Sequence, residues 1–225
     1  MLQGKDNQGE AGFVDSGILS AFVARVAELH RQDLLSSTLF GQLAADKLFS
    51  RMTQPEEWCQ KYFETIEKVG WQIGSFRFNH VRPVSATFTV EEMALALLET
   101  KVTPAEIELA RKTMRSLREL PEKDPRVVVF NGSSHSTNAV NVQISVRTPS
   151  VMVSAGLAFT TRQEVKRTLG EELLTAQLEG DILDFVQVGK LNEAVYSKVR
   201  ESVIEKLGPR RKELILQLDI ASSDS

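Results

Sequence analysis

Apolar and polar residues alternate along two segments in the second half of the chain. Between positions 139 and 147 the even-numbered residues are valine or isoleucine, and the polar residues between them are Asn141, Gln143, Ser145 and Arg147. A period of two indicates a β-strand with one face on the core and the other in water. The pattern returns after Pro149, over positions 151–160. We therefore predict two neighbouring strands at the centre of the fold, with the polar face of the first exposed.

The second of these strands has a reverse face of small, partly polar residues: Met152, Ser154, Gly156, Ala158 and Thr160. Strands that are buried on both faces have such compositions, so we favour a cover formed by the chain's own helices. A partner protein is an alternative cover. The same alternation also occurs in amphipathic hairpins that insert into membranes, where lipid-facing and lumen-facing residues take turns along the strand.

Apolar residues recur at helical spacing through much of the first half of the chain. They predict a helix from about Ser16 to Leu29 and a second over 39–48, with a weak break near 36–37. Thr-x-x-Glu capping boxes mark three further helix starts, at Thr53, Thr89 and Thr103. Gly70 is placed to end the first of these three helices, and Pro121 and Pro125 to end the last.

Shorter strands complete the predicted sheet. Alternation over 71–78 with a glycine at position 74 indicates a strand with a bulge. The segments 84–88 and 182–188 indicate two more strands, and the polar segment 131–138 is predicted to be a loop between two strands of the central block.

The end of the chain begins with a clear helix signal. Asn192 is placed to cap a helix that ends at Gly208. The last apolar pattern, up to Ile220, fits a final strand, although Pro209 and the charged residues after it also fit a helix start.

Together these elements predict an α+β fold. Helices lie mainly in the N-terminal half and pack on a mainly antiparallel sheet formed mostly by the C-terminal half. Residues 13–221 are predicted to form a single domain, and 1–12 and 222–225 to be tails. The βα alternation of a parallel nucleotide-binding sheet is absent from the pattern.

Composition narrows the class of protein without identifying a function. The chain of 225 residues has 42% hydrophobic and 25% charged residues, as soluble globular proteins do, and its net charge of −3 favours no binding to nucleic acid. One cysteine allows no disulfide within the chain. The polar N-terminus lacks a signal peptide and no apolar run could span a bilayer, which favours the cytoplasm and leaves signal-independent secretion open.

The sequence contains no motif for a metal site or a phosphate-binding site. His30, His80 and His135 are far from one another and from Cys59, so no zinc site is predicted. Neither G-x-x-x-x-G-K-[ST] nor G-x-G-x-x-G occurs. We therefore predict no cofactor.

The polar segment 131–138 is the best candidate for a binding surface. Its candidate binding residues are Asn131, Ser133, Ser134, His135 and Asn138. Polar loops between strands carry binding residues more often than other surfaces do. A nucleophile would need a positioned base, and no G-x-S-x-G elbow surrounds Ser134. Cys59, in a predicted helix, is more typical of a small core residue.

Three segments of the chain resemble a family of uncharacterised microbial proteins of similar length. They are LLSSTLFGQLAADK (34–47), PEEWCQKYFETIEKVGWQIGSFRF (55–78) and VYSKVRESVIEKLG (195–208). The resemblance implies a single continuous domain. It implies no activity, cofactor or site residue.

The sequence thus favours a non-enzymatic binding or interaction protein that uses its sheet or the 131–138 loop on an unknown protein or small ligand. A membrane-active or delivered effector is the first alternative. A hydrolase with Ser134 or Cys59 as nucleophile is the second.

Overall fold

The computed structural model describes residues 9–74, 77–81, 89–160 and 181–220. Its strands are β1 (Ala11–Asp15), β2 (Ile18–Phe22), β3 (Trp71–Ile73), β4 (Asn79–Val81), β5 (Ala139–Arg147), β6 (Met152–Thr160), β7 (Ile182–Leu191) and β8 (Ile215–Leu218). Its helices are α1 (Glu28–Asp46), α2 (Pro55–Lys68), α3 (Val90–Glu99), α4 (Pro104–Arg118), α5 (Pro125–Ser134), α7 (Glu193–Tyr196), α8 (Arg200–Leu207) and α9 (Arg210–Leu214).

The strands form one mixed, mostly antiparallel sheet in the order β3-β7-β6-β5-β2-β1-β8, and β4 also pairs with β7. The neighbours β2 and β5 run parallel, and the other described pairs are antiparallel. The α+β prediction is therefore confirmed at this level. The division by halves is only loosely so, because N-terminal strands β1 and β2 belong to the same sheet.

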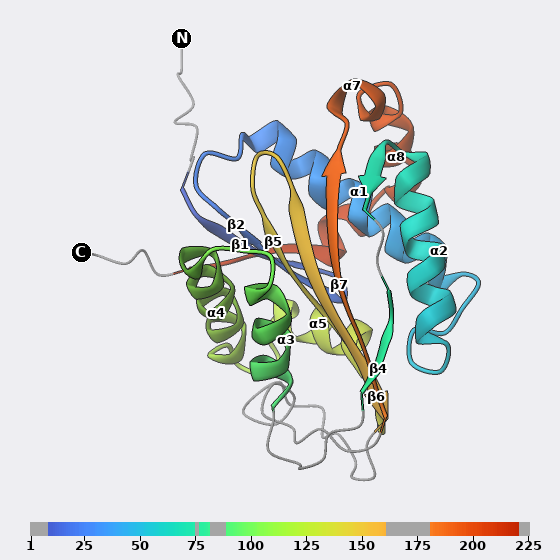
Figure 1. Cartoon of the computed structure of the whole chain (residues 1–225). Coiled ribbons are helices and arrows are strands. Elements are labelled where there is room, and N and C mark those ends of the chain that lie inside the picture. Colours follow the sequence, from blue (N-terminus) through green and yellow to red (C-terminus); the bar gives the residue numbers. More distant parts are fainter. Residues whose placement is uncertain (1–8, 75–76, 82–88, 161–180, 221–225) are drawn as a thin grey trace.

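Helices cover both faces of the sheet, which gives three layers (Figure 1). One core lies between the sheet and α3, α4 and α5. The other lies between the opposite face and α1, α2 and α8. The reverse face of β6 is buried from Met152 to Ala158, so the chain's own elements cover it, as predicted.

The prediction that the polar face of β5 is exposed was wrong. All nine residues of β5 are buried. The helix that covers the polar face, α1, is itself rich in buried polar side chains. The polar face therefore meets polar groups of the protein in place of water.

The N-terminal helix predicted from about Ser16 is a β-hairpin instead. Strands β1 and β2 pair antiparallel around a turn in which Ser16 has φ 52°. All ten strand residues are buried, so the hairpin lacks the alternation that identifies a half-exposed strand. Strand β1 also begins at Ala11, inside the predicted tail, whereas residues 1–8 and 221–225 lie outside the described residues.

The second predicted helix is longer than its apolar pattern. Helix α1 begins at Glu28, and the expected break near Ser36 and Ser37 lies in its middle. Helix α2 begins at Pro55 as predicted, but Gln54 is its N-cap and the capping box at Thr53 does not form. Gly70, with φ 107°, follows the end of α2, as the sequence indicated.

The other helix signals are confirmed. Thr89 and Thr103 form capping boxes at the starts of α3 and α4. Asn192 caps the short helix α7, which is separate from α8, and Gly208 ends α8. Both predictions for the end of the chain hold in part, because α9 precedes β8.

The segment before β5 differs from its prediction. Residues 125–134 form helix α5, with Asp124 accepting a hydrogen bond from the Arg126 amide and Pro125 in the first turn. The sequence carried this start signal, but the apolar run that follows also fits a strand. The strand predicted over 71–78 is divided into β3 and β4, and the one over 84–88 lies outside the described residues.

Candidate functional site

The five candidate binding residues do not form one exposed loop. Asn131, Ser133 and Ser134 lie in the last turn of α5, and only residues 136–138 form an exposed turn before β5. Ser133 Oγ lies 2.9 Å from Ser16 Oγ in the β1–β2 turn. Ser134 and His135 are buried. Asn138 is exposed, whereas the other four candidates are buried or partly buried.

The candidate nucleophiles are not placed for catalysis. Ser134 Oγ lies 3.3 Å from Nδ1 of its neighbour His135, but Ser134 has no exposed surface through which a substrate could reach it. Burial raises the pKa of the Cys59 thiol to about 12, so the thiol is protonated at neutral pH. The thiolate is the nucleophilic form of cysteine.

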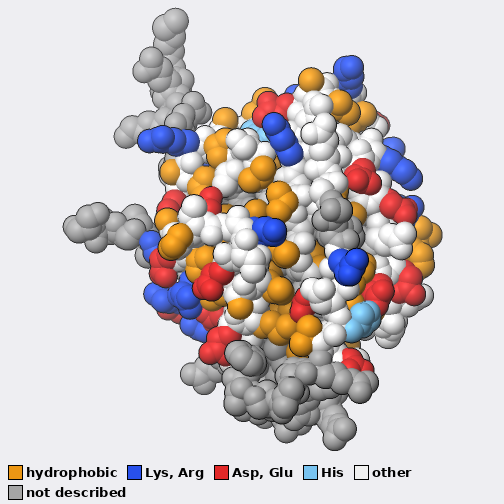
Figure 2. Space-filling view, in the orientation of Figure 1, with side chains coloured by type: hydrophobic (Ala, Val, Ile, Leu, Met, Phe, Trp, Pro, Cys, Tyr) orange, Lys and Arg blue, Asp and Glu red, His pale blue; other side chains and the backbone are white. Residues whose placement is uncertain are grey.

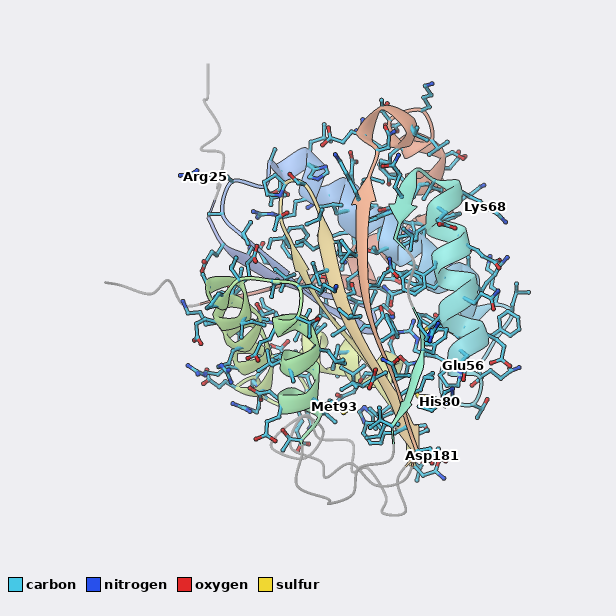
Figure 3. All side chains as sticks on the ribbon, in the orientation of Figure 1. Arg25, Glu56, Lys68, His80, Met93 and Asp181 are labelled. Atoms are coloured by element: carbon cyan, nitrogen blue, oxygen red, sulfur yellow. The ribbon has the colours of Figure 1, made fainter. Side chains whose placement is uncertain are left out.

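The remaining histidines each lie close to a carboxylate that is at least partly exposed. His80 Nε2 lies 3.1 Å from Glu56 Oε1 (Figure 3); His80 is exposed and Glu56 is half-exposed. His30 Nδ1 lies 2.9 Å from Glu193 Oε1. Within the described residues, no group of three or more His, Cys, Asp and Glu could hold a metal ion.

The face of the molecule in Figure 2 shows no dominant charge. Lys and Arg side chains are interspersed with Asp and Glu over the visible face, as Figure 2 shows. No helix among the described residues is both long and apolar enough to cross a membrane. The unusual chemistry of this protein lies inside it, between the sheet and α1.

Polar side chains form a buried layer between the sheet and helices α1 and α2. We call it the polar layer, and its sheet residues are Asp15, Ser20, Asn141, Gln143, Ser145, Arg147, Ser154 and Gln187. Two of them meet across the parallel pair β2–β5, where Ser20 Oγ lies 3.1 Å from Ser145 Oγ. Another, Asn141, donates a hydrogen bond to the Arg51 carbonyl.

Asp15 and Arg147 form the ionic centre of the polar layer. Neither side chain is exposed, and Arg147 Nη2 lies 3.5 Å from Asp15 Oδ2. Thr38 of α1 contacts both residues, with Oγ1 at 2.6 Å from Asp15 Oδ2 and at 3.2 Å from Arg147 Nη2. The Arg147 guanidinium also lies over the Phe22 ring and donates from Nε to Ser145.

The charges of this centre are strongly affected by burial. Burial raises the pKa of Asp15 to about 6, although Arg147, the Thr38 hydroxyl and Arg51 oppose the rise. Burial likewise lowers the pKa of Arg147, and Asp15 counteracts that change. The pair is incompletely hydrogen-bonded, because Asp15 Oδ1 and Arg147 Nη1 are buried without a hydrogen-bond partner among the described residues.

Helix α1 is bonded through its polar side chains to elements around it. Asp33 pairs with Arg200 of α8 at 2.6 Å, and Ser37 accepts a hydrogen bond from Trp71 Nε1 of β3 at 2.9 Å. Gln42 bonds the β1–β2 turn through the Asp15 carbonyl and the Gly17 amide. Loss of α1 from the sheet would therefore break bonds to several elements at once.

The opposite face of the central strands is apolar. In β5 it presents Val140, Val142, Ile144 and Val146 to the core under α3, α4 and α5. The sheet thus has an apolar core on one face and the polar layer on the other. The sequence predicted only the apolar core. The residues of the ionic centre were missed because Asp15 and Thr38 carry no local signal. Arg147 ends a polar alternation that is usually read as exposed.

Comparisons with known proteins leave the family open. No family model matches the chain, and no curated protein does, so the resemblance found in the sequence stays a prediction. A solved structure titled delta-endotoxin is similar at 13% identity and a TM-score of 0.40, over 78% of this chain and 83% of that one. A structure of the Evf virulence factor is similar at 11% identity and a TM-score of 0.34, over 90% and 85%. Both TM-scores are too low to bear on function.

Proposed function

We propose that the protein acts on lipid membranes and that the antiparallel unit β5–β6–β7 enters the bilayer. The observation that carries the proposal is the division of this unit into an apolar and a more polar face along its whole length. Its strands have 9, 9 and 10 residues. A tilted strand of about 9–11 residues spans the hydrocarbon core.

The apolar face extends across the three strands and is interrupted at Asp184. The register aligns its side chains in rows, which are Val140–Phe159–Ile182, Val142–Leu157–Asp184, Ile144–Ala155–Val186 and Val146–Val153–Val188. Asp184 is the single charged residue in these rows, and it accepts a hydrogen bond from Asn79. Such a face suits contact with lipid.

The other face carries much of the polar layer. Its polar residues are Asn141, Gln143, Ser145, Arg147, Ser154 and Gln187, and Met152 and Phe185 lie among them. A face that only packs against helices would be at least as stable with apolar residues, because burial of polar groups is unfavourable. In a membrane, the same residues would line water while the valines contact lipid.

The unit meets the rest of the sheet along two edges: β5 pairs with β2, and β7 pairs antiparallel with β3 and β4. Strands β5, β6 and β7 are consecutive in sequence and pair antiparallel, whereas β5 meets β2 in a parallel pair. Parallel pairing is slightly weaker per residue. We therefore place the opening at the β2–β5 seam.

A reversible lock across this seam tests the proposal. The Ser20 and Ser145 hydroxyl oxygens are 3.1 Å apart on register partners, so a Ser20→Cys, Ser145→Cys variant in a Cys59→Ser background can form a disulfide there. Dye release from anionic phosphatidylglycerol vesicles is measured between about pH 4.5 and 8.5. The oxidised variant should release no dye and the reduced variant should release it. A single Ser20→Cys variant in the same background should be insensitive to oxidation.

Two results would contradict the proposal at different points. Equal release by the oxidised and reduced forms would show that β5 does not leave β2. No release by the reduced form at any pH would reject membrane action. That outcome would favour an interaction protein, for which the exposed turn 136–138 is the remaining candidate surface, because helices cover both faces of the sheet.

A further inference from the structure

We infer that Asp15, Arg147 and Thr38 form a proton-controlled latch, which holds α1 on the sheet when Asp15 is protonated and weakens when Asp15 is ionised. The latch is a property of the folded chain in water. Its role as the control of membrane entry rests on the proposed function.

The latch joins three segments that are far apart in the sequence. Asp15 ends β1, Arg147 ends β5 and Thr38 lies in the middle of α1. Thr38 touches both charged residues, so it connects the helical layer to two strands of the sheet. Movement of α1 away from the sheet would separate Thr38 from both and admit water to Asp15.

The geometry suits a protonated Asp15 better than an ionised one. The Thr38 hydroxyl has one hydrogen, and three acceptors lie within its reach: Asp15 Oδ2 at 2.6 Å and the carbonyls of Leu34 at 2.8 Å and Leu35 at 3.1 Å. If Asp15 is protonated, its own hydrogen can bond Thr38 Oγ1 while the Thr38 hydrogen bonds Leu34. If Asp15 is ionised, one of these two bonds is lost.

Arg147 favours the ionised form of Asp15, but this pairing does not offset the burial of the carboxylate. The single contact between Asp15 and Arg147 is long, and Asp15 Oδ1 has no partner among the described residues. Removal of a charge from water is unfavourable unless close pairing and further hydrogen bonds offset it. The titratable groups facing Asp15 are Arg147 from β5, Arg51 from the α1–α2 connection and Tyr62 from α2. None of them supplies the missing hydrogen bond.

The direction of the pH effect follows from these contacts. The pKa of Asp15 is about 6 in the closed structure, whereas the ordinary value is 3.8. Between pH 3.8 and about 6, Asp15 is therefore protonated in the closed form and ionised in the open form. Stability of the closed form is greatest below about pH 4 and is lost as pH rises through 6, which changes the opening equilibrium by about 100-fold.

Hydrogen exchange of α1 in the full-length protein measures the latch directly. We expect protection factors of peptides from Glu28–Asp46, corrected for the intrinsic rate, to fall by about 25-fold between pH 4.5 and 7.5. Tryptophan fluorescence provides a second readout, because the two tryptophans of the chain bond α1 through Ser37 and Asp46. Acrylamide quenching should increase over the same range.

Two variants separate the latch from general loss of structure. Asp15→Asn removes the titration, so α1 should stay protected without a step near pH 6. Arg147→Met removes the cation that favours ionised Asp15, so the step should move to higher pH. Asp33→Asn is the matched control, because Asp33 is a second buried carboxylate, which lies in α1 and bonds Arg200 instead. It should keep the step near pH 6.

A flat pH profile in the wild type, or greater opening in acid, would overturn the latch even if a variant failed to fold. The same step in Asp15→Asn as in the wild type would also overturn it. These measurements use no lipid, so they are independent of the proposed function. Dye release without a step near pH 6 would show membrane action without latch control.

Discussion

At the scale of single residues, this protein buries polar side chains by matching them with other polar groups. Arg147 and Asp15 have no exposed surface, and they are joined through Thr38. Arg51 is nearly as buried, stacks on Trp58 and bonds Gln42. Such residues cannot be distinguished from surface residues by type alone. Their environment decides their chemistry, and Cys59 shows the same effect.

Cys59 is expected to be unreactive in the folded protein. It is 1% exposed, and burial raises the pKa of its thiol to about 12. Iodoacetamide at pH 8 should leave the native thiol unmodified, and mass spectrometry should show full labelling after unfolding in guanidinium chloride. Labelling of the native protein at the rate of a free thiol would make Cys59 a candidate nucleophile again.

At the scale of elements, the helix starts predicted from capping residues are confirmed where the capping residue bonds its own helix. Thr89 and Thr103 each form a complete capping box with the glutamate three residues later. Thr53 has the same sequence signal, but Gln54 became the N-cap of α2. Helix α1 had no comparable signal, and its polar side chains bond other elements.

These caps give a paired test of stability. Thr103→Ala removes a side-chain acceptor from the Glu106 amide and should lower the free energy of unfolding by about 1 kcal/mol. Thr53→Ala removes no cap and should change it by less than about 0.5 kcal/mol. Urea unfolding monitored by circular dichroism measures both. Equal losses in the two variants would show that the Thr103 box contributes nothing specific.

At the scale of the whole molecule, one sheet separates two unlike interiors. The side under α3, α4 and α5 is apolar, whereas the side under α1 and α2 combines apolar residues with the polar layer. The second side contains the buried ion pair of Asp15 and Arg147. Global stability should therefore depend on pH through that side.

The contribution of Asp15 to global stability should increase in acid. Because the folded state raises the pKa of Asp15 to about 6, it binds more protons there than the unfolded chain does. The free energy of unfolding of the wild type, taken relative to Asp15→Asn, should rise by about 2 kcal/mol from pH 7.5 to 4.5. Urea titrations at several pH values measure this difference. A constant difference would mean that Asp15 titrates alike in both states.

The sequence by itself determined the elements whose signals are local. The strands β5, β6 and β7, the capped starts of α3 and α4, and the helix end near Gly70 follow from periodicity and from single capping residues. The hairpin β1–β2 and helix α5 did not, because an apolar run fits a helix or a strand until its neighbours are known.

Only the tertiary structure decided what covers the polar face of β5. Alternation shows that one face differs from the other, but it cannot show whether water or a polar helix lies against it. Asp15, Thr38 and Arg147 come together from β1, α1 and β5, and the two contacts of Arg147 join residues more than 100 positions apart. The candidate latch exists because folding removes these residues from water, which no pattern along the chain records.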